Sequence, residues 1–129
     1  NVTHMVLMEG INDIGMSPSG DLISSAEVIA GYRQVIARAH AAGIKIIAAT
    51  LTPYEGAAYF TAAGENIRQE INAFIRNSGE FDGVIDFEKA VQDPTQPSRI
   101  LPEFTEDNLH PNDAGYKAMA DMVAIDLFE

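Results

Sequence analysis

The fold is decided first by residues 2–13, which read VTHMVLMEGIND. The run at residues 2–8 is almost continuously apolar, which is typical of a parallel strand buried on both faces. A loop is expected at residues 9–15, where Gly10 permits a tight turn at the strand end. The amide of Asn12 is suited to donate to a developing oxyanion, although Gly-x-Asn-Asp is also ordinary turn chemistry.

Helical and strand patterns alternate along the rest of the chain. We expect a helix from Ser24 or Ser25 to Gly43, a strand at 44–51, a helix at about 61–77, a strand at 84–87, a proline-rich irregular stretch, and a last helix from Pro111 or just after it. Ser24 and Glu27 fit a capping box at the start of the first helix. Such alternation predicts right-handed crossovers and a parallel sheet with helices on both faces. The sequence therefore predicts one three-layer α/β/α domain over residues 1–129.

The composition excludes several classes of partner and site. The chain has 129 residues and a net charge of −11, which disfavours nucleic acids and anionic membrane surfaces and fits a neutral substrate. There are no cysteines, so disulfides, thiolate catalysis and cysteine metal sites are excluded. No apolar run reaches the length of a membrane span.

The strongest chemical feature is the pentapeptide Asp107-Asn108-Leu109-His110-Pro111. The carboxylate can accept a hydrogen bond from one imidazole nitrogen and fix the tautomer, which leaves the other nitrogen free to act as a general base. A position near a helix N-terminus disfavours the imidazolium form and helps keep the resting base neutral. The spacing therefore indicates an acid–base pair.

Two other interpretations of this pair stay open at the sequence level. His110 could simply cap the last helix, with Asp107 as a solvated loop acid, because such pairs are common by chance. A metal site would need further ligands, and His4 and His40 do not stand at ligand spacing. The sequence predicts no metal site.

Together, the two loops resemble the SGNH/GDSL hydrolase family. That family has four blocks: Gly-Asp-Ser near the N-terminus, a glycine, Gly-x-Asn, and a late Asp-x-x-His. Residues 10–13 match the third block, and residues 107–111 match the fourth, placed before the final helix. Residues 42–47 and 110–116 are also similar to secreted bacterial-type members. The resemblance covers essentially the whole chain and implies a flavodoxin-like three-layer fold.

The resemblance also implies roles for individual residues. His110 would be the base, Asp107 would orient it, and Asn12 with Gly10 would form the oxyanion hole. The first two blocks are absent, so the nucleophile is carried over to no residue here, and Ser17 is kept only as a candidate substitute. The family chemistry needs neither a metal nor an organic cofactor.

The absent blocks suggest the C-terminal portion of a hydrolase, without its N-terminal strands. The strand at residues 2–8 would then be a bare edge, which is a template for pairing with another chain. We expect it to bind the missing segment or to form a homo-oligomer. The likeness to secreted members implies a secreted or periplasmic protein, although this segment contains no signal peptide.

The predicted function is hydrolysis of a carboxylic ester, such as an acetylated carbohydrate or a short acyl ester. The triad would be Ser-His-Asp, with its serine outside this chain. The alternative is a catalytically inactive, hydrolase-derived domain that oligomerises or binds a partner. The absent nucleophile favours this alternative.

Overall fold

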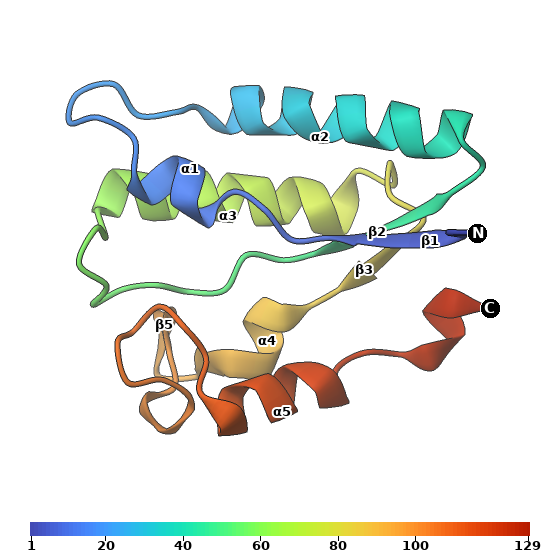
Figure 1. Ribbon diagram of the computed structural model, residues 1–129. Helices are drawn as coiled ribbons and strands as arrows, with labels where there is room; N and C mark the ends of the chain where they lie inside the picture. Colours follow the sequence, from blue (N-terminus) through green and yellow to red (C-terminus); the bar gives the residue numbers. More distant parts are fainter.

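A computed structural model describes residues 1–129 and is built on a three-stranded parallel sheet. Its strands are β1 (His4–Leu7), β2 (Lys45–Ala49) and β3 (Gly83–Ile85), with β2 in the middle. Figure 1 shows helices on both sides of the sheet, with α2 and α3 above it and α4 and α5 below it. The predicted three-layer α/β/α fold with a parallel sheet is confirmed.

The helices follow their local sequence signals. Their bounds are α1 (Ile11–Gly15), α2 (Ser25–Ala41), α3 (Ala62–Asn77), α4 (Phe87–Val91) and α5 (Asp113–Asp121). The predicted capping box is present at α2: the Ser24 hydroxyl accepts from the Glu27 amide at 3.2 Å, and the Glu27 carboxylate accepts from the Ser24 amide at 2.9 Å. No helix is both long enough and apolar enough to cross a membrane.

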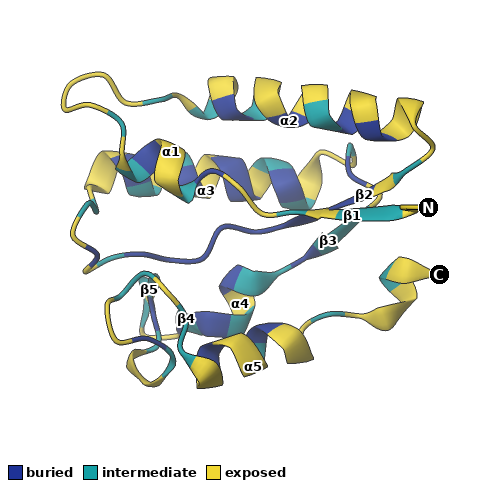
Figure 2. Ribbon diagram, viewed as in Figure 1, coloured by how far each residue is buried: buried dark blue, intermediate teal, exposed yellow.

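The central strand β2 lies between two apolar layers and is almost entirely buried from Ile46 to Ala49. Figure 2 colours the chain by burial. Ile46 and Ala48 face the large core under α2 and α3. Ile47 and Ala49 face the opposite side, where Ile85 and the C-terminal segment pack against them. Successive side chains of a strand point to opposite faces, so a strand with helices on both sides must be apolar throughout.

The edge strand β1 differs from its prediction. Met5 and Leu7 pack against the large core, as expected. The expectation that residues 2–8 are buried on both faces is wrong, because Val6 is 46% and Met8 36% exposed. The elements below the sheet cover β2 and β3, and on this side of β1 Phe128 packs against His4 while Val6 stays exposed.

Two segments that were expected to be irregular contain regular structure, and the last helix begins just after Pro111, as expected. The segment expected as a loop at residues 9–15 contains the short helix α1. The proline-rich stretch contains α4, the antiparallel pair β4 (Gln92–Asp93) and β5 (Gln96–Ile100), and the 3-10 turn Pro102–Phe104. The last helix begins after Asn112, whose side chain accepts from the Gly115 amide at 3.0 Å. A second 3-10 turn, Ile125–Phe128, ends the chain.

Candidate active site

The two predicted loops meet in one pocket at the carboxyl ends of the strands, which is where sites of open α/β sheets form. The pocket has a volume of about 220 Å³. Asn12 lines it from α1, Tyr59 from the loop after β2, and His110 from the loop before α5. Its remaining lining is mainly apolar and is contributed by Met8, Ile11, Thr52, Leu109, Pro111, Tyr116 and Met119.

The acid–base pair has the geometry that its spacing predicts. The Nδ1 atom of His110 lies 2.6 Å from Oδ2 of Asp107. The other carboxylate oxygen, Oδ1, accepts from the backbone amides of His110 at 2.8 Å and Leu109 at 2.9 Å. The hydrogen bond from the His110 ring, followed by these two amides, holds the pKa of Asp107 well below its ordinary value. The carboxylate is therefore charged and points at the imidazole.

This contact determines which ring nitrogen of His110 is available for chemistry. A charged carboxylate at 2.6 Å requires Nδ1 to carry the proton that is donated. The Nε2 atom then has a free lone pair, and it has no hydrogen-bond partner in the chain. The His110 side chain is 72% exposed, so Nε2 can reach a group that enters from outside. The arrangement can accept a proton from a nucleophile.

The loop that carries Asp107 and His110 is held by a hydrogen bond within it and by packing against the loop after β2. The hydroxyl of Thr105 donates to the carbonyl of His110 at 2.7 Å. Asn108 has a positive φ of 62°, and Gly56, with a φ of 98°, lies against its side chain. A Cβ on Gly56 would lie only 2.9 Å from the Asn108 side chain. The loop after β2 therefore supports the histidine loop closely.

The structure does not support the capping and metal interpretations of His110. The N-cap of α5 is Asn112, so His110 does not cap that helix. His4 lies at the other end of the molecule against the ring of Phe128, with 5.8 Å between ring centroids. His40 pairs with Asp82 and not with His110. No three histidine or acidic side chains converge in a way that could hold a metal ion.

Asn12 is held by a residue that the sequence did not point to. The hydroxyl of Tyr59 donates to Oδ1 of Asn12 at 2.9 Å. The Nδ2 group of Asn12 makes no hydrogen bond within the chain, and Asn12 lines the pocket that contains His110. Tyr59 belongs to no motif, so no sequence signal marks its contact with α1.

Gly10 is placed at the turn into α1 and not in the pocket of His110. It is buried, and its φ of 133° is a conformation that favours glycine. A Cβ there would lie 3.3 Å from both the Leu51 side chain and the Tyr32 hydroxyl. Gly10 lines the neighbouring cavity under α2. Its turn places Asn12 at the strand end.

Ser17 is engaged in local hydrogen bonds. Its hydroxyl donates to the carbonyl of Asp13 at 2.6 Å and accepts from the amide of Ile23 at 3.1 Å. Ser17 lines a separate cavity, and no serine lines the pocket that contains His110.

Comparisons with known proteins agree with this arrangement. The sequence profile of the GDSL-like Lipase/Acylhydrolase family matches residues 1–118. A crystal structure of a protein assigned as an acylhydrolase from Bacteroides fragilis aligns with a TM-score of 0.77 and 18% sequence identity, over 98% of this chain and 61% of that chain. A GDSL-like lipase from Bacteroides thetaiotaomicron aligns with a TM-score of 0.77 and 19% identity, over 95% of this chain and 60% of that chain.

These similarities support the fold and the family at different levels. At such low identity, the two crystal structures support the fold alone, and this chain spans about three fifths of their length. No curated protein sequence matches the chain. The family profile covers both predicted loops, at residues 10–13 and 107–111. On this evidence, the chain belongs to the GDSL-like lipase/acylhydrolase family of hydrolases.

Proposed function

We propose that the protein hydrolyses carboxylic esters with a Ser-His-Asp triad whose serine is supplied from outside residues 1–129. One observation carries this proposal: the Asp107–His110 pair presents a free Nε2 in the pocket that Asn12 also lines. A base and an oxyanion donor at one site are the two parts that acyl transfer needs besides the nucleophile.

The proposed reaction has two halves, formation and hydrolysis of an acyl-enzyme, and both use the same groups. Nε2 of His110 takes the proton of the serine hydroxyl as its oxygen attacks the acyl carbon, and Asp107 stabilises the imidazolium that forms. The Asn12 amide donates to the oxyanion. His110 then protonates the departing alcohol, and water releases the acid by the same steps.

The proposed substrate is a neutral ester with a small acyl group, such as an acetylated carbohydrate or a short acyl ester. The pocket is small and its lining is mainly apolar, which suits a short acyl group. The net charge of −11 and the charged Asp107 disfavour an anionic substrate near the base.

A fluorophosphonate label tests the nucleophile in the protein as its gene encodes it. We expect one serine outside residues 1–129 to be labelled, because only a serine beside a base reacts readily with this probe. Mass spectrometry of the digested protein would locate it, and His110→Ala should abolish the labelling. A label on Ser17 would refute the external serine, and labelling that persists without His110 would refute the role of the base.

We also propose that the free edge of β1 pairs with another strand, either from outside residues 1–129 or from a second copy. The outer edge of β1 has no strand partner, and Val2 and Val6 are exposed beside it. Residues 2–8 contain no proline or lysine, which are the residues that usually protect such an edge. This observation is also what favours the alternative function as an assembling or binding domain.

Light scattering on residues 1–129 tests the edge. We expect a species larger than the 13.9 kDa monomer, and we expect Val6→Lys to shift it towards the monomer because lysine blocks edge pairing. Leu22→Lys, which changes an exposed side chain in the loop before α2, is the matched control and should leave the assembly unchanged. A wild-type chain that is a clean monomer would contradict pairing with a second copy and leave only a strand from outside residues 1–129 as the partner.

A further inference from the structure

The contact between Tyr59 and Asn12 determines which half of the Asn12 amide remains available. A side-chain amide has an accepting oxygen and a donating NH₂ group. The Tyr59 hydroxyl donates to the oxygen at 2.9 Å, so the NH₂ group is the half without a partner in the chain. Only a donor stabilises an oxyanion. The opposite orientation of the amide would place an oxygen towards that negative charge.

The ring of Tyr59 packs closely against α1 at Gly15. Gly15 lies three residues after Asn12, on the same side of the helix. A Cβ on Gly15 would lie 2.5 Å from two ring carbons of Tyr59, so any larger residue would displace the ring. Gly15 is helical and has no positive φ, so its backbone does not itself call for glycine. Tyr54 packs edge-on against the same ring, with 5.9 Å between centroids.

The surroundings of Tyr59 keep its phenol protonated. Burial, and then the negative charge of Asp107, raise its pKa above the ordinary value of 10.0. The other titratable groups around it are Tyr54, which packs on the ring, and His110 and Tyr116, which line the same pocket. A phenol that stays protonated remains a donor. A phenolate would instead accept, and it would draw the amide nitrogen of Asn12 towards itself.

We propose that Tyr59 is a positioning residue, which holds the Asn12 amide with its NH₂ group towards the oxyanion. This inference rests on the proposed hydrolysis but concerns a residue outside the triad and outside the two motifs. Tyr59 acts through Asn12, so its effect falls on stabilisation of the transition state and not on binding of the ester.

Steady-state hydrolysis of p-nitrophenyl acetate tests the proposal in the protein as its gene encodes it. We expect Tyr59→Phe to lower kcat about tenfold with little change in KM, a smaller loss than the roughly 10²–10³-fold of an oxyanion donor removed outright. Gly15→Ala should act in the same way by displacing the ring. Tyr54→Phe is the control, because it keeps the packing ring and removes a hydroxyl that does not contact Asn12.

The pH profile separates positioning from simple packing. In the wild type, kcat should fall at alkaline pH as Tyr59 ionises, and Tyr59→Phe should lack this limb. Incorporation of 3-fluorotyrosine at position 59 should move the limb to lower pH, because fluorine makes the phenol more acidic. A packing role would leave the limb in place in all three proteins.

The outcomes distinguish this inference from the proposed function. If Tyr59→Phe matches Tyr54→Phe while Asn12→Ala loses activity, Tyr59 has no positioning role and the proposed function stands. If hydrolysis survives in His110→Ala, the proposed function fails. NMR then decides the inference alone: strong contacts between the Asn12 NH₂ protons and the Tyr59 ring protons would show the opposite amide orientation and overturn it.

Discussion

His110→Ala is expected to lower kcat for ester hydrolysis by about 10²–10⁴-fold, the range that a positioned general base contributes. Without the imidazole, no other side chain in the pocket takes up a proton from the nucleophile at neutral pH, since the remaining lining is apolar, phenolic, hydroxylic or amide. The charged Asp107 would lose its ring partner but keep its two backbone amides. Steady-state kinetics with p-nitrophenyl acetate, on the protein as its gene encodes it, measures this loss.

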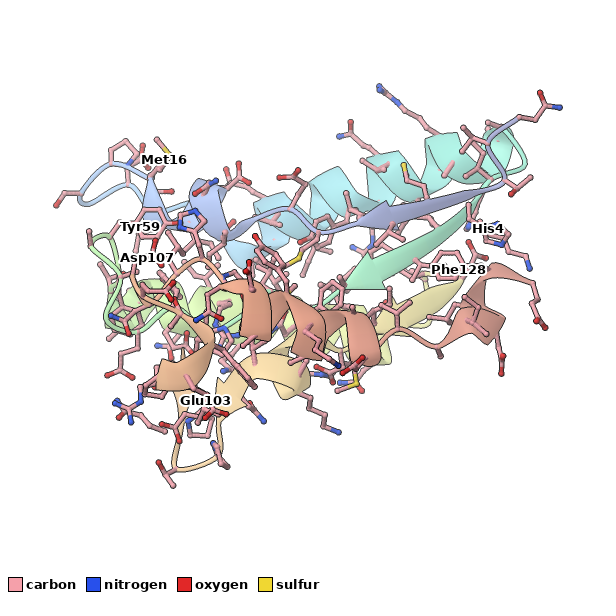
Figure 3. All side chains as sticks on the ribbon, turned by 60° about the horizontal axis from the view of Figure 1, so that its bottom comes forward. His4, Met16, Tyr59, Glu103, Asp107 and Phe128 are labelled. Carbon is pink, nitrogen blue, oxygen red and sulfur yellow. The ribbon has the colours of Figure 1, made fainter.

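The chain offers a matched control for this substitution. Nε2 of His40 lies 2.8 Å from Oδ2 of Asp82, so this pair is another histidine–carboxylate contact on the surface. Asp82 also accepts from the amide of Ile46, near the start of β2, and the pair therefore lies at the end of the sheet opposite the pocket. Figure 3 shows Tyr59 and Asp107 together at one end of the molecule and His4 with Phe128 at the other.

We expect His40→Ala to leave kcat unchanged. Both histidine side chains are substantially exposed, so neither alanine variant should unfold the protein. Circular dichroism of the two variants would check this point. Equal kcat values for His110→Ala and His40→Ala would refute the role of His110 as base.

Arg68→Ala is expected to lower the free energy of unfolding by about 3–5 kcal/mol, the range for breaking a buried ion pair. The Arg68 side chain is 0% exposed. Its guanidinium contacts Glu65 at 2.7 Å, forms an ion pair with Glu88, and donates to the carbonyl of Leu51 at 2.8 Å. Alanine would remove the only cation that contacts both carboxylates and would leave a cavity between α3 and α4, while Asn72 and Gln69 would remain as neutral donors to the same acceptors.

Urea denaturation of Arg68→Ala and of a surface control measures this difference. Arg33 is 57% exposed and pairs with Glu80 at 2.8 Å, so Arg33→Ala should change the free energy of unfolding by less than about 1 kcal/mol. Similar losses for the two variants would mean that the buried network contributes no more than a surface pair. Leu51, whose carbonyl accepts from Arg68, directly precedes Thr52 in the pocket lining.

Features that depend on neighbours in the sequence were predictable from the sequence. The alternation of apolar strands with helical stripes predicts the parallel layers, since each element must bury its own apolar face. The Ser24–Glu27 capping box and the Asp107–His110 turn involve residues only three positions apart, so their geometry is largely local. The likeness of residues 10–13 and 107–111 to two family blocks predicted the family that the profile match shows.

The hydrophobic pattern predicted burial less well where a residue is covered by segments far away in the sequence. Residues 2–8 are almost continuously apolar, as a doubly covered strand would be, but the packing below the sheet covers β2 and β3 and, on β1, reaches His4 and not Val6. An apolar run shows that both faces of a strand could be buried, but it does not show whether a helix covers each face. Arg68 is a second example. Its charge predicts a surface position, but in the folded chain it is buried because Glu65, Glu88 and the Leu51 carbonyl all contact its guanidinium.

The layers, the family and the two loops that carry Asn12 and His110 could therefore be predicted from the amino-acid sequence. The folded structure was needed to show that these loops share a pocket and that Tyr59, from a third segment, donates to the Asn12 amide. The physical reason is that Tyr59 and Asn12 are 47 positions apart, so no short-range sequence pattern predicts their hydrogen bond. It exists only because the parallel sheet brings the ends of its strands to one edge.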